Sequence, residues 1–383
     1  MGRAPDRLRM IKYLGSKRTI LPKLLQVVRS MRSVRTVVDL FAGTSRVGHA
    51  LKRAGYRVLA NDHNAYAHRL AACYVQADRD GVLADAERLL GELQRLPGAP
   101  GPFTATYCEA ARYLHPKNGA RVEAIRMAIA AMALPFELES VLLVALMEAA
   151  DRVDSTTGVQ MAYLKQWAPR ALEDLRLRVP DVLPRANRGK GEAHCLDAVV
   201  AAEQLHGDLL YVDPPYNQHS YLGNYHVWES LVRWDHLDVY GKARKRVDCK
   251  ERTSDFNSRR RILPALRSVL ERTTARTIVM SFNDEGYVSR AQIEELLGSL
   301  WGGRANVVTL PIDYPRYVGA RIGIHNARGE KVGTVGRLRN VEHLFVASRS
   351  DVEGRLRAAG LLSAPEAAPG MQKEQSAGVQ PSA

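Results

Sequence analysis

The sequence predicts an α/β fold in which a sheet built from strand–helix–strand units is interrupted by a long helical insertion. Three observations support this prediction. A strand–loop–helix–strand pattern fills residues 36–62, helical patterns dominate residues 67–188, and strand patterns return after residue 189. Short apolar runs bounded by turn residues indicate buried strands, whereas apolar residues that recur every three to four positions indicate helices. Alternating strands and helices are typical of α/β sheets.

Composition narrows the class of protein. The chain has 383 residues, 46% of them hydrophobic, which is enough for a large domain with an insertion. Its formal net charge of +14 favours polyanionic partners, nucleic acid first. The four cysteines form no CxxC pair, so we expect neither a structural zinc site nor a disulfide framework. No apolar run is long enough to span a bilayer, and no signal-peptide segment follows the basic N-terminus, so we expect a cytoplasmic soluble protein.

The first element is a glycine turn that leads into a helix. Residues 12–18 read Lys-Tyr-Leu-Gly-Ser-Lys-Arg, and a helical pattern continues to about residue 32. Ser16 is a candidate helix cap. A turn of this kind presents backbone N–H groups and cations together, as an anion or a polar ligand requires.

The next unit has the form of a nucleotide-binding strand–loop–helix. Residues 36–41 predict a buried strand, residues 42–48 form a glycine-containing loop, and a second strand at 55–60 ends in Asn61 and Asp62. Asp62 stands where an acidic residue can accept hydrogen bonds from ribose hydroxyls. The loop is not G-x-G-x-x-G, because Ser45 replaces the central glycine. A carboxylate at the strand end, Asp39, disfavours a pyrophosphate and favours a cationic ligand such as S-adenosylmethionine.

The helical insertion contains helical patterns but no chemical constellation. We expect helices at about 67–77, 82–96, 121–132 and 138–150, and a turn at 115–119, which reads His-Pro-Lys-Asn-Gly. The polar side chains of this region are either nucleic-acid contacts or ordinary solvated faces. The candidate contacts are Arg112, His115, Lys117, Asn118, Arg121 and Lys165.

A stiff corner follows the buried strand at 209–212. Its sequence is Asp213-Pro-Pro-Tyr216, and the prolines end the strand because they cannot donate ladder hydrogen bonds. The corner offers the carboxylate of Asp213, the carbonyl of Pro214 and the ring of Tyr216. These groups suit a planar substrate with an amino group, because the two acceptors take its N–H bonds and the ring stacks on its face.

The remainder of the chain is basic and then low in complexity. Residues 240–261 carry nine Lys and Arg residues and predict salt-dependent contact with a nucleic-acid backbone. Strands are expected at 276–281, 305–310 and 342–347, with a loop or hairpin at 314–337. We expect Ser281 and Asn283 to help shape the substrate pocket. Residues 350–383 are rich in Ala, Gly, Pro, Gln and Ser and are expected to be a disordered tail.

The ordered set of residues 12–18, 39–48, 61–62 and 213–216 resembles the Dam-like DNA adenine methyltransferases, over about 12–70 and 190–350. The resemblance implies an α/β, Rossmann-like S-adenosylmethionine-dependent methyltransferase sheet with a helical target-recognition insertion. It also implies S-adenosylmethionine as methyl donor and double-stranded DNA, with a flipped adenine, as substrate. The loop departs from the commonest pattern at residues 44–46, where Thr-Ser-Arg replaces a glycine-richer stretch.

Several roles are carried over from the resemblance. The implied catalytic residues are Asp213, Pro214, Pro215 and Tyr216. The implied cofactor-binding residues are Tyr13, Lys17, Asp39, Phe41, Gly43, Asp62, Asp197 and Asp213. The expected nucleic-acid contacts are Lys117, Asn118, Arg121, Lys242, Arg244, Lys245 and Arg246. We expect no metal.

The predicted organisation has four segments. Residues 1–66 form the first part of the catalytic domain, 67–188 the insertion, 189–349 the second catalytic part and 350–383 the tail. Three alternatives stay open at this point: an RNA adenine methyltransferase, a cytosine-N4 DNA methyltransferase, and a DNA-binding protein without catalysis. A cognate restriction endonuclease is a candidate partner. The sequence leaves the oligomeric state and the target sequence open.

Overall fold

The computed structural model of the protein describes residues 10–15, 17–315 and 339–363. Ser16, most of the loop expected at 314–337 and residues 364–383 lie outside the described residues. Within the described ranges, no helix combines the length and the apolar character that crossing a membrane requires.

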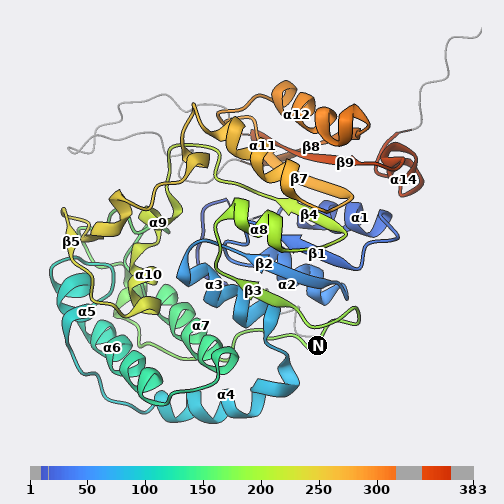
Figure 1. The fold of residues 1–383 in the computed structure, drawn as a ribbon. Coiled ribbons are helices and arrows are strands. Elements are labelled where there is room, and N and C mark those ends of the chain that lie inside the picture. The colour runs from blue at the N-terminus through green and yellow to red at the C-terminus, as the bar shows by residue number, and fades with distance from the viewer. Residues whose placement is uncertain (1–9, 16, 316–338, 364–383) are drawn as a thin grey trace, which may run out of the picture.

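Seven strands of the described chain form one central sheet with the order β3-β2-β1-β4-β7-β9-β8 (Figure 1). Neighbouring strands from β3 to β7 pair in parallel, whereas β9 is antiparallel to both β7 and β8. The mixed, mostly parallel α/β sheet confirms the predicted fold class. The strands are β1 (Thr36–Asp39), β2 (Arg57–Asn61), β3 (Glu192–His194), β4 (Leu209–Val212), β7 (Thr277–Asn283), β8 (Asn306–Pro315) and β9 (Arg339–Ser348).

Helices cover both faces of the sheet. Successive strand residues point to opposite sides, so the apolar strands pack against helices on each face. Leu210 and Met280 pack on the face covered by α8 (Ala198–Gln204), α11 (Ile262–Arg272) and α12 (Arg290–Gly303). Leu209 and Val279 pack on the face covered by α1 (Leu21–Ser30), α2 (Arg46–Arg53) and α14 (Val352–Ala358).

Helix α14 corrects one prediction. A disordered tail was expected from residue 350, but Val352 and Leu356 of α14 are fully buried in the core beneath the sheet. Asp351 caps this helix by accepting a hydrogen bond from the backbone N–H of Gly354 at 2.8 Å. A cap and two apolar residues one turn apart are enough to anchor a short helix.

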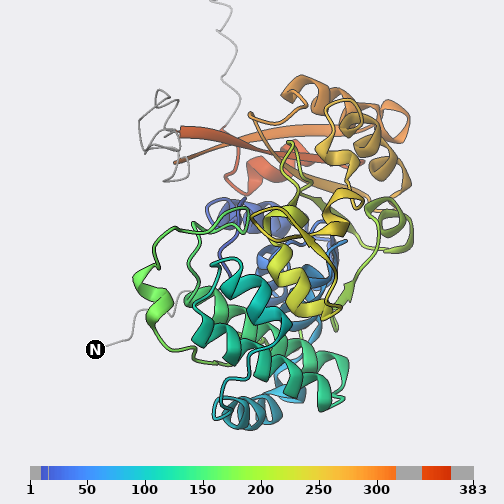
Figure 2. The same cartoon turned by 90° about the vertical axis from the view of Figure 1, so that its left-hand side faces the viewer.

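The segment between β2 and β3 is helical, as expected. In Figure 2 its helices gather in the lower part of the view, with α10 (His226–Arg233) beside them. The longest of them, α7 (Phe136–Arg152), is apolar on all sides over residues 141–147 and lies at the centre of a core that also holds Trp228 and Leu231 of α10. The elements are α3 (Ala65–Ala71), the π-helix η1 (Ala72–Gln76), α4 (Arg79–Leu93), α5 (Pro102–Thr104), η2 (Ala105–Glu109), α6 (Pro116–Ala131), α7 (Phe136–Arg152) and η3 (Pro169–Leu172).

The turn expected at 115–119 is instead the start of α6. His115 is the N-cap, and its side chain accepts a hydrogen bond from the backbone N–H of Lys117. Pro116 occupies the first helical position, where its missing N–H is not needed. The region after β4 also contains a hairpin, which overlaps the basic stretch at 240–261. Its elements besides α10 are α9 (Tyr221–Asn224), β5 (Val239–Tyr240), β6 (Lys245–Arg246), η4 (Val247–Lys250) and η5 (Asp255–Asn257).

Candidate active site

A cavity of about 650 Å³ lies beyond the carboxyl ends of β1 and β4. These two strands are neighbours, and Asp39 pairs in register with Tyr211. The chain leaves β1 toward β2 on one side and returns to β4 on the other, so the cavity sits at the topological switch point, where α/β sheets bind ligands. All eight predicted cofactor residues line this cavity: Tyr13, Lys17, Asp39, Phe41, Gly43, Asp62, Asp197 and Asp213.

Asp39 is the charged group most fully enclosed at the cavity wall. Its side chain is 1% exposed, and neither carboxylate oxygen has a hydrogen-bond partner among the described residues. Burial and the nearby charges of Asp213 and Asp62 raise the pKa of Asp39 to about 7, although the neighbouring backbone N–H of Gly48 offsets part of the rise. An unsatisfied buried carboxylate is costly unless a ligand completes it. The site therefore suits a positively charged ligand group.

The glycine loop after β1 is shaped by its contacts. Gly43 has a φ of +51°, and a Cβ there would meet the ring of Tyr13 at 3.3 Å. The backbone N–H of Gly43 donates to Asp62 Oδ2 at 3.0 Å, and that of Asn64 donates to Asp62 Oδ1 at 2.9 Å. Burial raises the pKa of Asp62. Asp62 thus fixes the loop and presents its carboxylate to the cavity at the end of β2.

Asp197 has a local structural role as well as its place at the cavity wall. It is the N-cap of α8, and its Oδ1 accepts a hydrogen bond from the backbone N–H of Val199 at 2.8 Å. Its side chain is exposed.

The Asp-Pro-Pro-Tyr corner is held by donors from two distant segments. Lys17 Nζ lies 2.9 Å from Asp213 Oδ1, and the hydroxyl of Ser281 donates to the same oxygen at 3.0 Å. Tyr211 in turn has its hydroxyl 2.8 Å from that of Ser281. Burial raises the pKa of Asp213 to about 6 against the lowering effect of Lys17. Because both donors that the structure describes bind Oδ1, Oδ2 is the oxygen left for a substrate.

The residues of this corner differ in their access to the cavity. Pro215 lines the cavity, whereas Pro214 is buried and Tyr216 packs against Phe282 with ring centres 5.3 Å apart. Tyr221, which was not among the residues predicted from the sequence, also lines the cavity. It belongs to a stack of three rings, in which Tyr13 lies 5.1 Å from Tyr221 and 4.5 Å from Tyr225.

The segment between the hairpin and α11 forms another wall of the cavity. Phe256 meets Phe41 edge to face at 5.0 Å, and Asn257 donates to the carbonyl of Asn217 at 2.7 Å. Arg252 anchors the segment by donating to Glu229 at 2.8 Å. From the sequence, residues 240–261 were interpreted as a DNA-binding loop, but residues 252–257 line the cavity. The many basic residues of this stretch obscured Phe256, the apolar residue that packs against Phe41.

The residues of the insertion that were predicted to contact nucleic acid form hydrogen bonds or ion pairs within the protein. Asn118 is 2% exposed and donates to the carbonyls of Ala171 and Glu173, so the prediction that it contacts DNA is wrong for this structure. Lys117 is exposed but forms an ion pair with Asp174 at 3.0 Å. Arg121 is half-buried and donates to the carbonyl of Gln94 at 2.8 Å.

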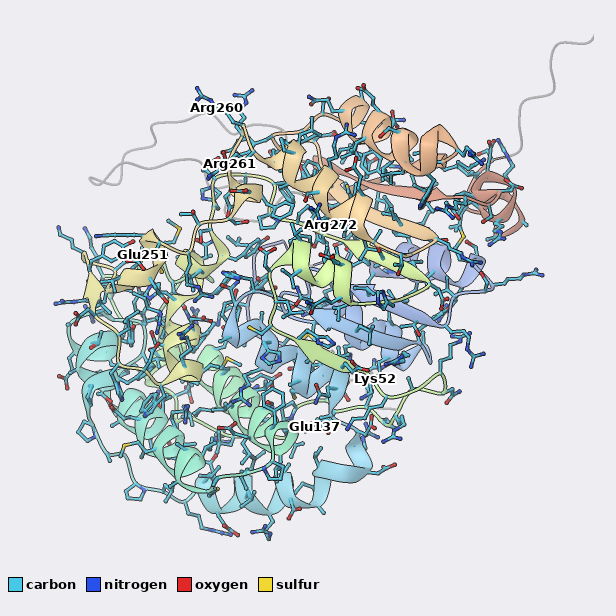
Figure 3. All side chains as sticks on the ribbon, viewed as in Figure 1. Lys52, Glu137, Glu251, Arg260, Arg261 and Arg272 are labelled. Carbon is cyan, nitrogen blue, oxygen red and sulfur yellow. The ribbon has the colours of Figure 1, made fainter. Side chains whose placement is uncertain are left out.

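The predicted contacts on the hairpin differ in their exposure. Arg246 is fully buried and pairs with Asp235 at 2.7 Å and with Asp248 at 3.1 Å, so it is a structural residue rather than a DNA contact. Lys242 is exposed, whereas Arg244 and Lys245 are half-buried. Three further arginines at the surface precede α11, and Figure 3 labels two of them at the outer edge of the molecule: Arg259, Arg260 and Arg261.

Comparison with known proteins agrees with this geometry. Residues 13–280 match the D12 class N6 adenine-specific DNA methyltransferase family. The chain is 29% identical over 298 residues to the type II methyltransferase M.NlaIII of Neisseria lactamica, covering 75% of this chain and 87% of that protein. It is 28% identical to the type II methyltransferase M.FokI of Planomicrobium okeanokoites and 28% identical to the modification methylase StsI of Streptococcus sanguinis.

The matches cover a larger share of this chain than of two of the relatives. The alignments cover 76% and 75% of this chain, but the chain spans only 47% of M.FokI and 46% of StsI, about half the length of each. The family match extends over most of the chain and includes the glycine loop, Asp62 and the Asp-Pro-Pro-Tyr corner. This chain belongs to the D12 class N6 adenine-specific DNA methyltransferase family.

Proposed function

We propose that the protein transfers the methyl group of S-adenosylmethionine to the exocyclic amino nitrogen of adenine at a specific site in double-stranded DNA. The observation that carries this proposal is that two carboxylates with different surroundings line the same cavity. Asp39 is a buried acceptor that lacks a partner among the described residues, and Asp213 has one oxygen bound and the other available. The first suits a cationic methyl donor, and the second suits an amino group.

The cavity residues fit the methyl donor by their chemistry. S-adenosylmethionine supplies an electrophilic methyl group on a sulfonium centre and also carries an ammonium group. Asp39 would hold the positively charged part, because it is a buried anion that no described residue completes. Asp62 would accept the ribose hydroxyls at the end of β2. By the family resemblance, Asp197 would lie at the adenine end.

The corner would bind and orient the target base. A base inside a duplex cannot reach a buried pocket, so the adenine must be flipped out of the stack. Asp213 Oδ2 and the carbonyl of Pro214 would accept the two amino protons. The lone pair of this nitrogen is delocalised into the ring, and two acceptors on its protons draw it toward tetrahedral geometry. The nitrogen then becomes nucleophilic toward the methyl group.

Catalysis would consist mainly of positioning and electrostatics. S-adenosylmethionine, when bound, would supply a methyl group whose C–S bonding pair stays on sulfur, which balances the new N–C bond. The methylated nitrogen carries one proton too many, and Asp213 is the acceptor already bound to it. The donors on Oδ1 keep Asp213 ionised and oriented for this step.

The basic surface near the cavity supports DNA as the carrier of the base. Arg259, Arg260 and Arg261 lie at the surface, and Arg261 also lines the cavity mouth. Their charges attract a phosphate backbone. The names of the relatives, type II methyltransferase and modification methylase, support the further proposal that a restriction endonuclease accompanies the enzyme.

A single experiment tests this function. The protein is expressed in a host that lacks DNA methylation, and the host DNA is sequenced for modified bases. We expect N6-methyladenine in one short sequence context, and an Asp213→Ala variant run in parallel should leave the DNA unmodified. Methylated cytosine, or unmodified DNA in the presence of folded wild-type protein, would contradict the proposal.

A further inference from the structure

Lys17 bridges two carboxylates that are far apart in the sequence. Its ammonium group lies 2.9 Å from Asp213 Oδ1 and 2.6 Å from Glu342 Oε1. Glu342 is on β9, outside the 13–280 range of the family match, and its partner Lys17 is 325 positions away. Glu342 is 3% exposed and Lys17 is 8% exposed. Two charges of opposite sign are therefore buried together with the carboxylate of the catalytic corner.

We propose that Glu342 is a positioning residue, which acts through Lys17 to set the strength of Asp213 as an acceptor for the substrate amino group. This inference rests on the proposed function for its catalytic meaning. Its physical content is that one ammonium group is shared between two carboxylates. Glu342 draws part of the interaction of Lys17 away from Asp213, and so prevents Lys17 from fully neutralising it.

The electrostatics of the cluster follow this division. Burial raises the pKa of Asp213, Lys17 lowers it and Glu342 raises it, with a result of about 6. Burial alone would lower the pKa of Lys17, but Asp213 and Glu342 together raise it well above its usual range. Lys17 therefore stays protonated. An isolated Lys–Asp pair would instead lower the pKa of the carboxylate.

Other groups face Asp213 from the surrounding elements, and each differs from Glu342 in its effect. Asp39 on β1 is a carboxylate, and its pKa and that of Asp213 are linked by repulsion. The hydroxyl groups of Tyr211, Tyr216 and Tyr221 surround the same space, and burial raises the pKa of Tyr211 and Tyr221, so these two stay neutral. His343, next to Glu342, pairs instead with Asp284 at 3.2 Å.

This arrangement serves the proposed reaction. A carboxylate paired with an unshared buried ammonium is a weak acceptor, because the full positive charge stabilises its ionised form and lowers its pKa. Proton transfer is efficient when the pKa of the acceptor lies near the working pH. By sharing Lys17, the protein keeps Asp213 ionised near neutral pH and still basic enough to take the amino proton.

The test compares variants that act on the pair in opposite directions. In the full-length protein, the titration midpoint of Asp213 is measured by carboxyl ¹³C NMR, with its signal assigned by its disappearance in an Asp213→Asn variant. Glu342→Gln removes a negative charge and should move the midpoint to lower pH. Lys17→Met removes a positive charge and should move it to higher pH, by about one unit or more. The acid limb of the pH profile of kcat should follow the same two directions.

Two controls separate this role from general damage. Glu342→Asp keeps the charge and should restore the midpoint toward that of the wild type. Glu294→Gln removes a carboxylate that accepts from Thr309 at 2.6 Å, away from the cavity, and should leave the midpoint unchanged. An unchanged or raised midpoint in folded Glu342→Gln overturns the inference. If the midpoints move as expected but the wild type does not methylate DNA, the proposed function fails while the control of Asp213 by Glu342 stands.

Discussion

Glu123 in the helical insertion and Asp39 at the end of β1 are both 1% exposed, yet their surroundings are opposite. Glu123 accepts hydrogen bonds from the backbone N–H groups of Gly101, Phe103 and Thr104 at 2.7, 3.0 and 2.8 Å, and from the hydroxyl of Thr104 at 2.6 Å. Asp39 forms no such hydrogen bond with a described residue, although the backbone N–H of Gly48 lies near it as a donor. One carboxylate is completed by the protein, and the other is not.

The difference shows how structural and functional burial can be told apart. A buried carboxylate with all its acceptors used stabilises the fold and has nothing left for a ligand. A buried carboxylate without donors raises the free energy of the folded protein, and such groups persist where a ligand completes them. The insertion follows the first pattern and the cavity follows the second. Substitutions in the two regions should therefore separate activity from stability.

The largest effect is expected on activity in the cavity. Asp213→Ala removes the acceptor of the amino proton, and kcat should fall by at least about 10²–10⁴-fold, the usual contribution of a positioned acid–base group. The reaction is followed by methyl transfer from radiolabelled S-adenosylmethionine to DNA. Binding of S-adenosylmethionine, measured by calorimetry, should be largely retained. A variant that methylates at a similar rate would refute the role of Asp213.

The converse substitution lies in the insertion. Glu123→Gln leaves donors of residues 101–104 poorly paired, and the free energy of unfolding should fall by roughly 2–3 kcal/mol. Urea unfolding at pH 7 measures this decrease. The rate per folded molecule should stay near that of the wild type. If stability were unchanged while kcat fell, the contrast between the two regions would be wrong.

The residues found from the sequence share a local signal. The glycine loop and the Asp-Pro-Pro-Tyr corner each lie within a few positions of a strand end, so one pattern shows both the strand and the site. Glu342 reaches Asp213 through long-range packing on Lys17, and no spacing in the chain indicates that contact. Tyr221 follows the corner closely in sequence, but its stacking on Tyr13 joins distant segments and has no local signal.

The predicted DNA contacts were less reliable because residue type does not reveal exposure. Arg246 has carboxylates at positions 235 and 248, close enough in sequence to suggest an internal ion pair, but the positive charge of the whole stretch outweighed them. Asn118 gave no such signal. Its partners lie in a segment more than fifty residues further along the chain, which folds back onto α6.

Asp39→Asn should show an effect of intermediate size on both properties. The pKa of Asp39 is raised from 3.8 to about 7, so the folded protein holds this proton more tightly than the unfolded chain does. The stability associated with neutral Asp39 is therefore complete below pH 3.8 and is lost as pH rises through about 7. Relative to the wild type, Asp39→Asn should gain at least about 1 kcal/mol at pH 8 and little at pH 4.

The same variant should bind S-adenosylmethionine at least about tenfold more weakly at pH 8, because a neutral amide attracts a cation less than a carboxylate does. Denaturation curves at the two pH values and calorimetric titration give both numbers. A variant that is less stable than the wild type at pH 8, and binds the ligand equally well, would place Asp39 with Glu123 as a structural carboxylate.

The smallest expected effect concerns two exposed lysines, one in the insertion and one on the β5–β6 hairpin. Lys117 in the insertion already pairs with Asp174, whereas Lys242 is exposed on the hairpin. Removing one lysine that binds a phosphate lowers the slope of log K against log salt by about one. Lys242→Ala should show that decrease with a modest reduction in affinity, and Lys117→Ala should leave the slope unchanged. If Lys117→Ala lowered the slope and Lys242→Ala did not, the insertion rather than the hairpin would contact the DNA backbone. Lys117 would then exchange its ion pair with Asp174 for a stronger one with a phosphate.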